Sequence, residues 1–226
     1  MVFTKKFIHA IFTITLLLSL TQVTTSTEAT KKLIIILDPA GDENHTGRVI
    51  ENTFERGLTL QCAQALQQEL ETRIPNSTVI LTRKTGKAVT TLQNASLANR
   101  MAADLYISIH FFQETSVKPT VFLYQFSYND DQLTLPATLA FYPYDQAHRI
   151  HSKQTSAWIG LLKALLTSDS YKKGCSIKGA FKIPFAPLIG IIAPAIGIEA
   201  GLIHANDWQL LVEPITQSII AFAGQI

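Results

Sequence analysis

The sequence predicts an α/β fold: a single domain built on a mostly parallel, twisted sheet with helices on both faces. Two observations lead to this prediction. Short apolar runs without polar alternation, such as LIIIL, read as buried strands, and they alternate with longer segments of helical periodicity. Hydrophobic residues make up 47% of the 226 residues and charged residues 16%. That composition excludes a disordered chain, a coiled coil and a collagen-like repeat.

The predicted elements follow from the chain in order. The LIIIL run at 33–37 ends at Asp38-Pro39, and between 53 and 72 apolar residues recur at helical spacing until Pro75 and Asn76. We expect further strands at 78–81, 104–109, 120–126 and 195–198, further helices at 92–102, 146–166 and 207–223, and a loop at 168–182.

The first residues have the pattern of an export signal. Lys5 and Lys6 precede the apolar run at 7–20, and small and polar residues follow. Cleavage after Ala29 would separate a signal peptide, 1–29, from a domain spanning 30–226. The alternative is an uncleaved membrane anchor. We therefore expect a periplasmic or secreted protein.

Charge and cysteine content narrow the class of protein further. The net charge is +2, too small a basic excess for a general nucleic-acid binder. Export permits a disulfide between Cys62 and Cys175, although Cys62 lies in an apolar helical pattern that suits a buried thiol. No CxxC pair occurs, which argues against a cysteine-based zinc site.

Polar residues gather where the predicted strands end. Asp38 leads into a loop with Asp42 and His45, while His110 and Glu199 end two later strands. Glu55 opens the first long helix, so it points to the same edge of the sheet. Ligands of open α/β sheets bind at this edge.

Two histidines and two glutamates at one edge would suit a zinc hydrolase. Imidazoles and a carboxylate can hold zinc with one position open, where the pKa of water falls to about 7, and a further carboxylate can move the proton. Taken singly, each residue also has a structural explanation. A strand-end histidine can simply be hydrogen-bonded, and an acidic residue in a first helical turn can interact with the helix dipole.

Several of these motifs resemble the zinc-dependent N-acetylmuramoyl-L-alanine amidases of the AmiC/CwlM-like class. The family opens on a strand and Asp-Pro-Gly-His-Gly-Gly, where this chain has ILDPAGDE. The other matching segments are Glu55-Arg56 before an apolar helix, Leu81-Thr82-Arg83, Ala98-Asn99, ADLYISIH ending at His110, and PAIGIEAGL around Glu199. The resemblance covers nearly the whole predicted domain.

By this resemblance the protein would cleave peptidoglycan between N-acetylmuramic acid and the first L-alanine of the stem peptide. Zn²⁺ would be the cofactor, with Glu55 and His110 as ligands and Glu199 as general base. The resemblance also implies peptidoglycan or muropeptides as partners. We expect a monomer without nucleic acid, and an activator protein is an open possibility.

One departure from the family pattern concerns the first metal ligand. The family's histidine aligns with Gly41, so His45 or Asp42 of the same loop would have to take its place. We expect His45 to do so. The alternative is a degenerate site in a protein that binds peptidoglycan without cutting it.

Three further features lie near the candidate site. Arg48 could bind the acidic stem peptide or be a solvated surface residue. His204 lies close to Glu199 in sequence and is at most a supporting residue. An aromatic group could form a sugar-binding wall or pack under a loop; it comprises Tyr124, Tyr128, Phe141, Tyr142 and Tyr144.

Overall fold

The computed structural model describes residues 32–85, 87–128 and 143–225. The predicted signal peptide, 1–29, lies outside these residues. Within the described part of the chain, no helix is both long enough and apolar enough to cross a membrane.

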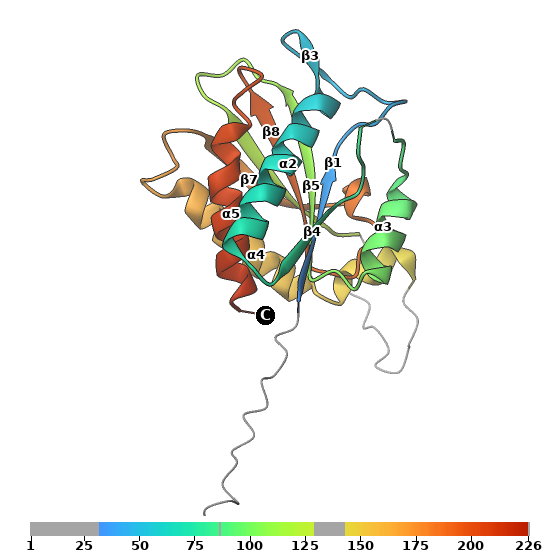
Figure 1. Ribbon diagram of the computed structural model, residues 1–226. Coiled ribbons are helices and arrows are strands. Elements are labelled where there is room, and N and C mark those ends of the chain that lie inside the picture. Colours follow the sequence, from blue (N-terminus) through green and yellow to red (C-terminus); the bar gives the residue numbers. More distant parts are fainter. Residues whose placement is uncertain (1–31, 86, 129–142, 226) are drawn as a thin grey trace, which may run out of the picture. The chain divides into compact units, whose positions relative to one another are not determined.

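A six-stranded sheet forms the centre of the fold (Figure 1). Its strands, in spatial order, are β4 (Ser77–Leu81), β1 (Leu33–Pro39), β5 (Leu105–Gln113), β8 (Ala195–Leu202), β6 (Thr120–Phe126) and β7 (Ser176–Ile183). The first four run parallel, β6 is antiparallel to β8, and β7 is parallel to β6. This confirms the predicted mostly parallel sheet.

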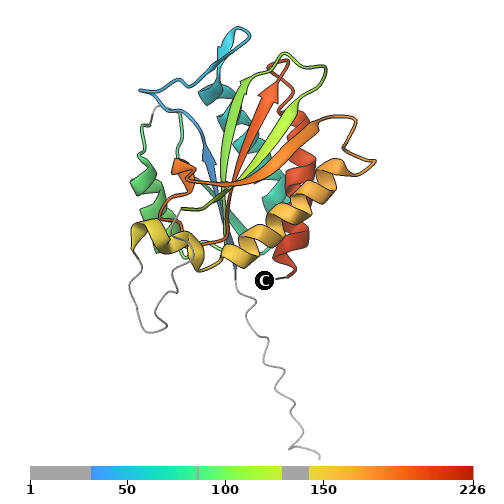
Figure 2. The same cartoon turned by 180° about the vertical axis from the view of Figure 1, so that it is seen from behind.

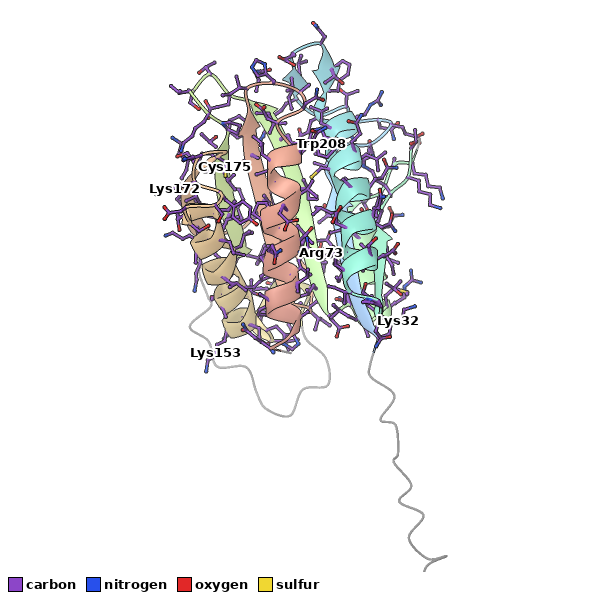
Figure 3. All side chains as sticks on the ribbon, turned by 60° about the vertical axis from the view of Figure 1, so that its left-hand side comes forward. Lys32, Arg73, Lys153, Lys172, Cys175 and Trp208 are labelled. Carbon is purple, nitrogen blue, oxygen red and sulfur yellow. The ribbon has the colours of Figure 1, made fainter. Side chains whose placement is uncertain are left out.

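The larger part of the core lies under three helices on one face: α2 (Glu55–Arg73), α4 (Ser152–Thr167) and α5 (Gln209–Ala223). Figure 3 shows them side by side, with Arg73 of α2 near α5. Its Nη1 lies 2.7 Å from Oε2 of Glu213 on α5. Leu58, Cys62, Leu66 and Leu70 of α2 are buried at four-residue spacing, which is why this helix packs on the sheet.

The opposite face is covered less completely. There α3 (Thr91–Arg100) and two short 3-10 helices, η1 (Tyr144–Arg149) and η2 (Ala186–Leu188), pack on a smaller cluster around Tyr106. Figure 2 shows this side, where parts of β8, β6 and β7 are not crossed by a helix. Helices on both faces are therefore confirmed, with unequal coverage.

Some elements differ from the sequence-based prediction. The prediction of a loop at 168–182 was wrong from Ser176 on, where β7 begins; it is an edge strand whose mostly exposed residues lack an apolar pattern. The predicted helix at 146–166 is divided into η1 and α4. A short hairpin, β2 (Val49–Ile50) with β3 (Thr53–Phe54), precedes α2.

The structure also shows whether Cys62 and Cys175 form a disulfide. Cys62 and Cys175 are both free and buried. Burial raises the pKa of the Cys62 thiol to about 12, as expected for a thiol that contributes only packing.

Candidate active site

Glu55, His110 and Glu199 meet at the carboxyl edge of the sheet. His110 on β5 is directly opposite Glu199 on β8. The prediction that these two residues end their strands was wrong, because β5 and β8 continue pairing to Gln113 and Leu202. Both residues lie within their strands, on the less covered face of the sheet.

Glu55 reaches this edge because β1 stops short of β5. Among the residues that the structure describes, β5 has no strand partner on that side beyond Pro39, and the backbone N–H of Phe111 donates to Glu55 Oε1 at 3.0 Å. The N–H of Arg48 donates to Oε2 at 3.1 Å. Burial alone would raise the pKa of Glu55, but the interaction with His110 and the hydrogen bonds from these two N–H groups lower it below the usual value.

His110 is held by a short chain of hydrogen bonds. Its Nε2 lies 3.0 Å from Ser108 Oγ, which donates to Asp38 Oδ2 at 3.2 Å. An ionised carboxylate only accepts, so the hydroxyl hydrogen goes to Asp38 and Nε2–H donates to Ser108. In the neutral ring the lone pair of Nδ1 then faces Glu55, with Nδ1 3.6 Å from Oε1.

This pair fits two ligands of a zinc ion. An imidazole lone pair and a carboxylate facing each other need a positive charge between them, either a proton or a metal cation. The Ser108–Asp38 chain supplies the outer hydrogen bonding that orients metal-binding histidines. Catalytic zinc sites, however, use three protein ligands. Within 32–85, 87–128 and 143–225, no group of three His, Cys, Asp or Glu residues is arranged to hold a metal.

His45 does not join Glu55 and His110 in this structure. Its side chain is 81% exposed, and its Nδ1 lies 3.2 Å from Asp42 Oδ1. Asp42 also accepts the backbone N–H groups of Asn44 and His45 at 2.8 and 2.7 Å. The two candidates for the missing ligand thus bond to each other within the loop.

The conformation of Gly41 disfavours any side chain at this position. Its φ is +77°, and a Cβ added there would lie 2.7 Å from Arg56 Cβ. The loop closes on itself through a bond from Asp42 N to His45 O at 2.8 Å. A histidine cannot replace Gly41 without a different loop.

Arg48 and Tyr124 hold Glu199 from two sides. Arg48 Nη1 donates to Glu199 Oε1 at 2.6 Å, and the Tyr124 hydroxyl donates to Oε2 at 2.8 Å. Burial and the hydrogen bond to Glu199 raise the pKa of Tyr124 to about 12, so this hydroxyl stays protonated. Sequence reasoning placed neither residue on Glu199; the period-2 spacing of Phe122 and Tyr124 in β6 was the available signal.

Aromatic rings form one wall of the site. Phe185 stacks on Tyr124 at 4.7 Å between centroids and meets His110 edge-on at 5.2 Å. Gly197 makes room for this ring, because a Cβ there would lie 2.6 Å from it. Of the aromatic group named from the sequence, Tyr124 lies beside Glu199, whereas Phe141 and Tyr142 fall outside the described residues.

Two further residues have structural roles. Arg83 is buried and donates to backbone carbonyls on both sides of the 41–48 loop, at Pro39, Ala40 and Arg56. His204 lies 3.0 Å from Glu51 and so ties the turn of the β2–β3 hairpin to the loop after β8. Its imidazole therefore pairs with Glu51 and not with Glu199.

The sequence and the fold of this chain match those of peptidoglycan amidases. The model of the N-acetylmuramoyl-L-alanine amidase family matches residues 35–224, and the chain is a member of that family. Over 76 residues it is 36% identical to the N-acetylmuramoyl-L-alanine amidase CwlM of Bacillus licheniformis. That match covers 34% of this chain and 30% of CwlM, so the chain spans about a third of its curated relative.

Solved structures share the fold at low sequence identity. The amidase Ami1 from Mycobacterium smegmatis superposes with a TM-score of 0.61 at 14% identity, over 86% of this chain and 98% of Ami1. An N-acetylmuramoyl-L-alanine amidase from Clostridium difficile 630 gives 0.54 at 20% identity, over 86% and 98% of the two chains.

Proposed function

We propose that the protein is an exported, zinc-dependent N-acetylmuramoyl-L-alanine amidase. It hydrolyses the amide between N-acetylmuramic acid and the first L-alanine of peptidoglycan stem peptides, in the periplasm or outside the cell. The observation that carries this proposal is the meeting of Glu55, His110 and Glu199 at one edge of the sheet. Membership of the family supports the substrate class.

In this proposal Glu55 and His110 would hold the zinc ion, and His45 would be the third ligand if the loop 41–47 turned inward. Bound zinc would polarise the scissile carbonyl and make water nucleophilic at neutral pH. Gly41 and Gly47, both at positive φ, give this loop unusual backbone geometry at each end. The movement is needed because His45 is bonded to Asp42 in this structure.

Glu199 acts as the general base. It takes a proton from the attacking water as the oxygen bonds to the lactyl carbonyl carbon, and it returns the proton to the alanine nitrogen as the C–N bond breaks. Tyr124 and Arg48 orient its carboxylate, and the Phe185 ring shields His110 on one side. The products are a lactyl carboxylate and a stem peptide with a free amine.

A second function is favoured by one specific observation. His45 is exposed and paired with Asp42, so among the described residues Glu55 and His110 face each other without a third ligand, an arrangement that suits a protein which binds peptidoglycan without cutting it. A partner protein that moves the loop would reconcile the two. CwlD of Clostridioides difficile, whose fold is similar with a TM-score of 0.56, was solved in complex with the GerS lipoprotein.

Metal titration and sacculus digestion separate the two functions. The full-length chain is stripped with a chelator, titrated with Zn²⁺ by calorimetry and then incubated with purified sacculi, whose products are identified by mass spectrometry. We expect one zinc per chain and release of stem peptides. His110→Ala and His45→Ala should each abolish zinc binding, Glu199→Gln should keep zinc but lose cleavage, and His151→Ala, outside the site, should change neither.

Each remaining outcome decides against the amidase or against one of its proposed zinc ligands. Sacculus binding with neither zinc uptake nor peptide release supports the binding protein. Zinc uptake without release, in the presence of intact sacculi, overturns the hydrolase. Zinc uptake that survives His45→Ala excludes His45 as the third ligand.

A further inference from the structure

Arg48 is held in a defined position beside the candidate general base. It follows Gly47, and its backbone N–H is bonded to Glu55. Its Nη1 donates to Glu199 Oε1 at 2.6 Å and contacts the carbonyl of Phe111 at 3.5 Å. The guanidinium also lies over the ring of Phe112, 5.6 Å from its centroid. These contacts orient a side chain that would otherwise be free to rotate.

The guanidinium of Arg48 has more N–H donors than its protein contacts use. It presents five N–H groups in a planar fork. Its side-chain hydrogen bonds to the described residues are all donated by Nη1. The Nε and Nη2 groups remain for a ligand, and the side chain is 52% exposed. A planar edge with two parallel N–H donors matches the two oxygens of a carboxylate.

The position of this edge limits which carboxylate it can reach. Because Arg48 touches Glu199, a group that it binds must lie near the scissile amide. Successive residues of a peptide are about 3.8 Å apart at Cα, so the residue after the scissile L-alanine lies within reach. In peptidoglycan stem peptides that residue is a D-glutamate whose α-carboxyl group is either free or amidated.

We propose that Arg48 is a specificity-determining residue that binds the free α-carboxylate of the second stem-peptide residue. The inference rests on the proposed function, since it places the stem peptide at this site. One guanidinium then bridges two carboxylates, that of Glu199 and that of the substrate. Stem peptides that carry a carboxamide at this position lose the ion pair and bind more weakly.

Two muramyl dipeptides that differ in this one group test the proposal. They are N-acetylmuramoyl-L-alanyl-D-glutamate and N-acetylmuramoyl-L-alanyl-D-isoglutamine. Binding is measured by calorimetry on the full-length, metal-free chain, so that the carboxylate cannot bind a metal. The background is Glu199→Gln, which prevents hydrolysis and removes the unpaired carboxylate that Arg48→Met alone would leave behind.

In the Glu199→Gln background we expect the glutamate form to bind at least about tenfold more tightly than the isoglutamine form, as a charge-assisted bidentate pair predicts. Adding Arg48→Met should bring the ratio to about one, whereas adding Arg100→Met, an exposed arginine on α3, should leave it unchanged. If both dipeptides bind equally well with Arg48 present, the inference fails while the proposed function stands. If neither binds and the wild-type chain does not digest sacculi, both fail.

Discussion

Arg83 holds the loop of the candidate site to the rest of the domain. The residue is 6% exposed. Its Nε donates to the carbonyl of Pro39 at 2.9 Å, and its Nη2 donates to those of Ala40 and Arg56 at 2.8 Å each. These carbonyls belong to the end of β1 and the first turn of α2, which precede and follow the loop. Arg83→Met removes these three bonds and the longer one from Nη2 to Thr59 Oγ1 at 3.3 Å, while it keeps most of the apolar stem.

The size of the effect follows from these contacts. A hydrogen bond to a charged group contributes about 1.5–3 kcal/mol. The full sum is not expected, because the carbonyl of Ala40 keeps a second donor, Thr59 Oγ1, at 2.8 Å. We expect a net loss of about 3–5 kcal/mol in the free energy of unfolding, a large part of the 5–15 kcal/mol typical of a domain.

Urea unfolding of the full-length chain, followed by far-UV circular dichroism, measures this loss. With a slope of about 2 kcal/mol per molar, the midpoint should fall by about 2 M at unchanged slope. Lys84→Met, at the exposed neighbouring position, serves as the control and should stay within about 0.5 kcal/mol of wild type. A loss below about 1 kcal/mol for Arg83→Met would refute the role assigned to these hydrogen bonds.

Two more predictions concern single contacts. Gly41→Ala should lower the free energy of unfolding by about 1–3 kcal/mol, because φ is +77° and the added Cβ would lie 2.7 Å from Arg56. Gly57→Ala is its control: the nearest atom to an added Cβ is 3.9 Å away, so urea unfolding should show no loss. The hydrogen bond to Glu51 raises the pKa of His204 above 6.5. The stability that the His204–Glu51 interaction contributes is therefore complete below pH 6.5 and is lost as the pH rises through the folded-state pKa. In an NMR titration Glu51→Gln should return that pKa toward 6.5, and an unchanged value would contradict the pairing.

Element type was predictable wherever burial was complete. Ile35, Ile36 and Leu37 of β1 are fully buried on both faces of the sheet, and such strands appear in a sequence as unbroken apolar runs. The edge strand β7 was not predictable in this way. It pairs with β6 alone and is mostly exposed, so its residues need no apolar pattern.

The contacts in the candidate site were also predictable only in part. Glu55 and His110 were predictable as neighbours, because the start of a helix and a polar residue on a parallel strand meet at one edge of the sheet. The partners of Glu199 were not predictable. Arg48 lies 151 residues away in sequence and Tyr124 lies 75, and only the folded chain brings them to its two oxygens.

The sequence by itself determined the α/β class, the mostly parallel sheet and the identity of the polar residues at its edge. Buried strands and packed helices each require a characteristic local pattern of apolar residues, which can be read from the sequence. Only the tertiary structure decided which of those residues touch. It turned His45 toward Asp42 and away from the Glu55–His110 pair, and it placed the charge of Arg48 on Glu199. The reason is that the loop 41–48 takes its conformation from glycines at positive φ and from Arg83 and Arg56, whose hydrogen bonds join segments far apart in the chain.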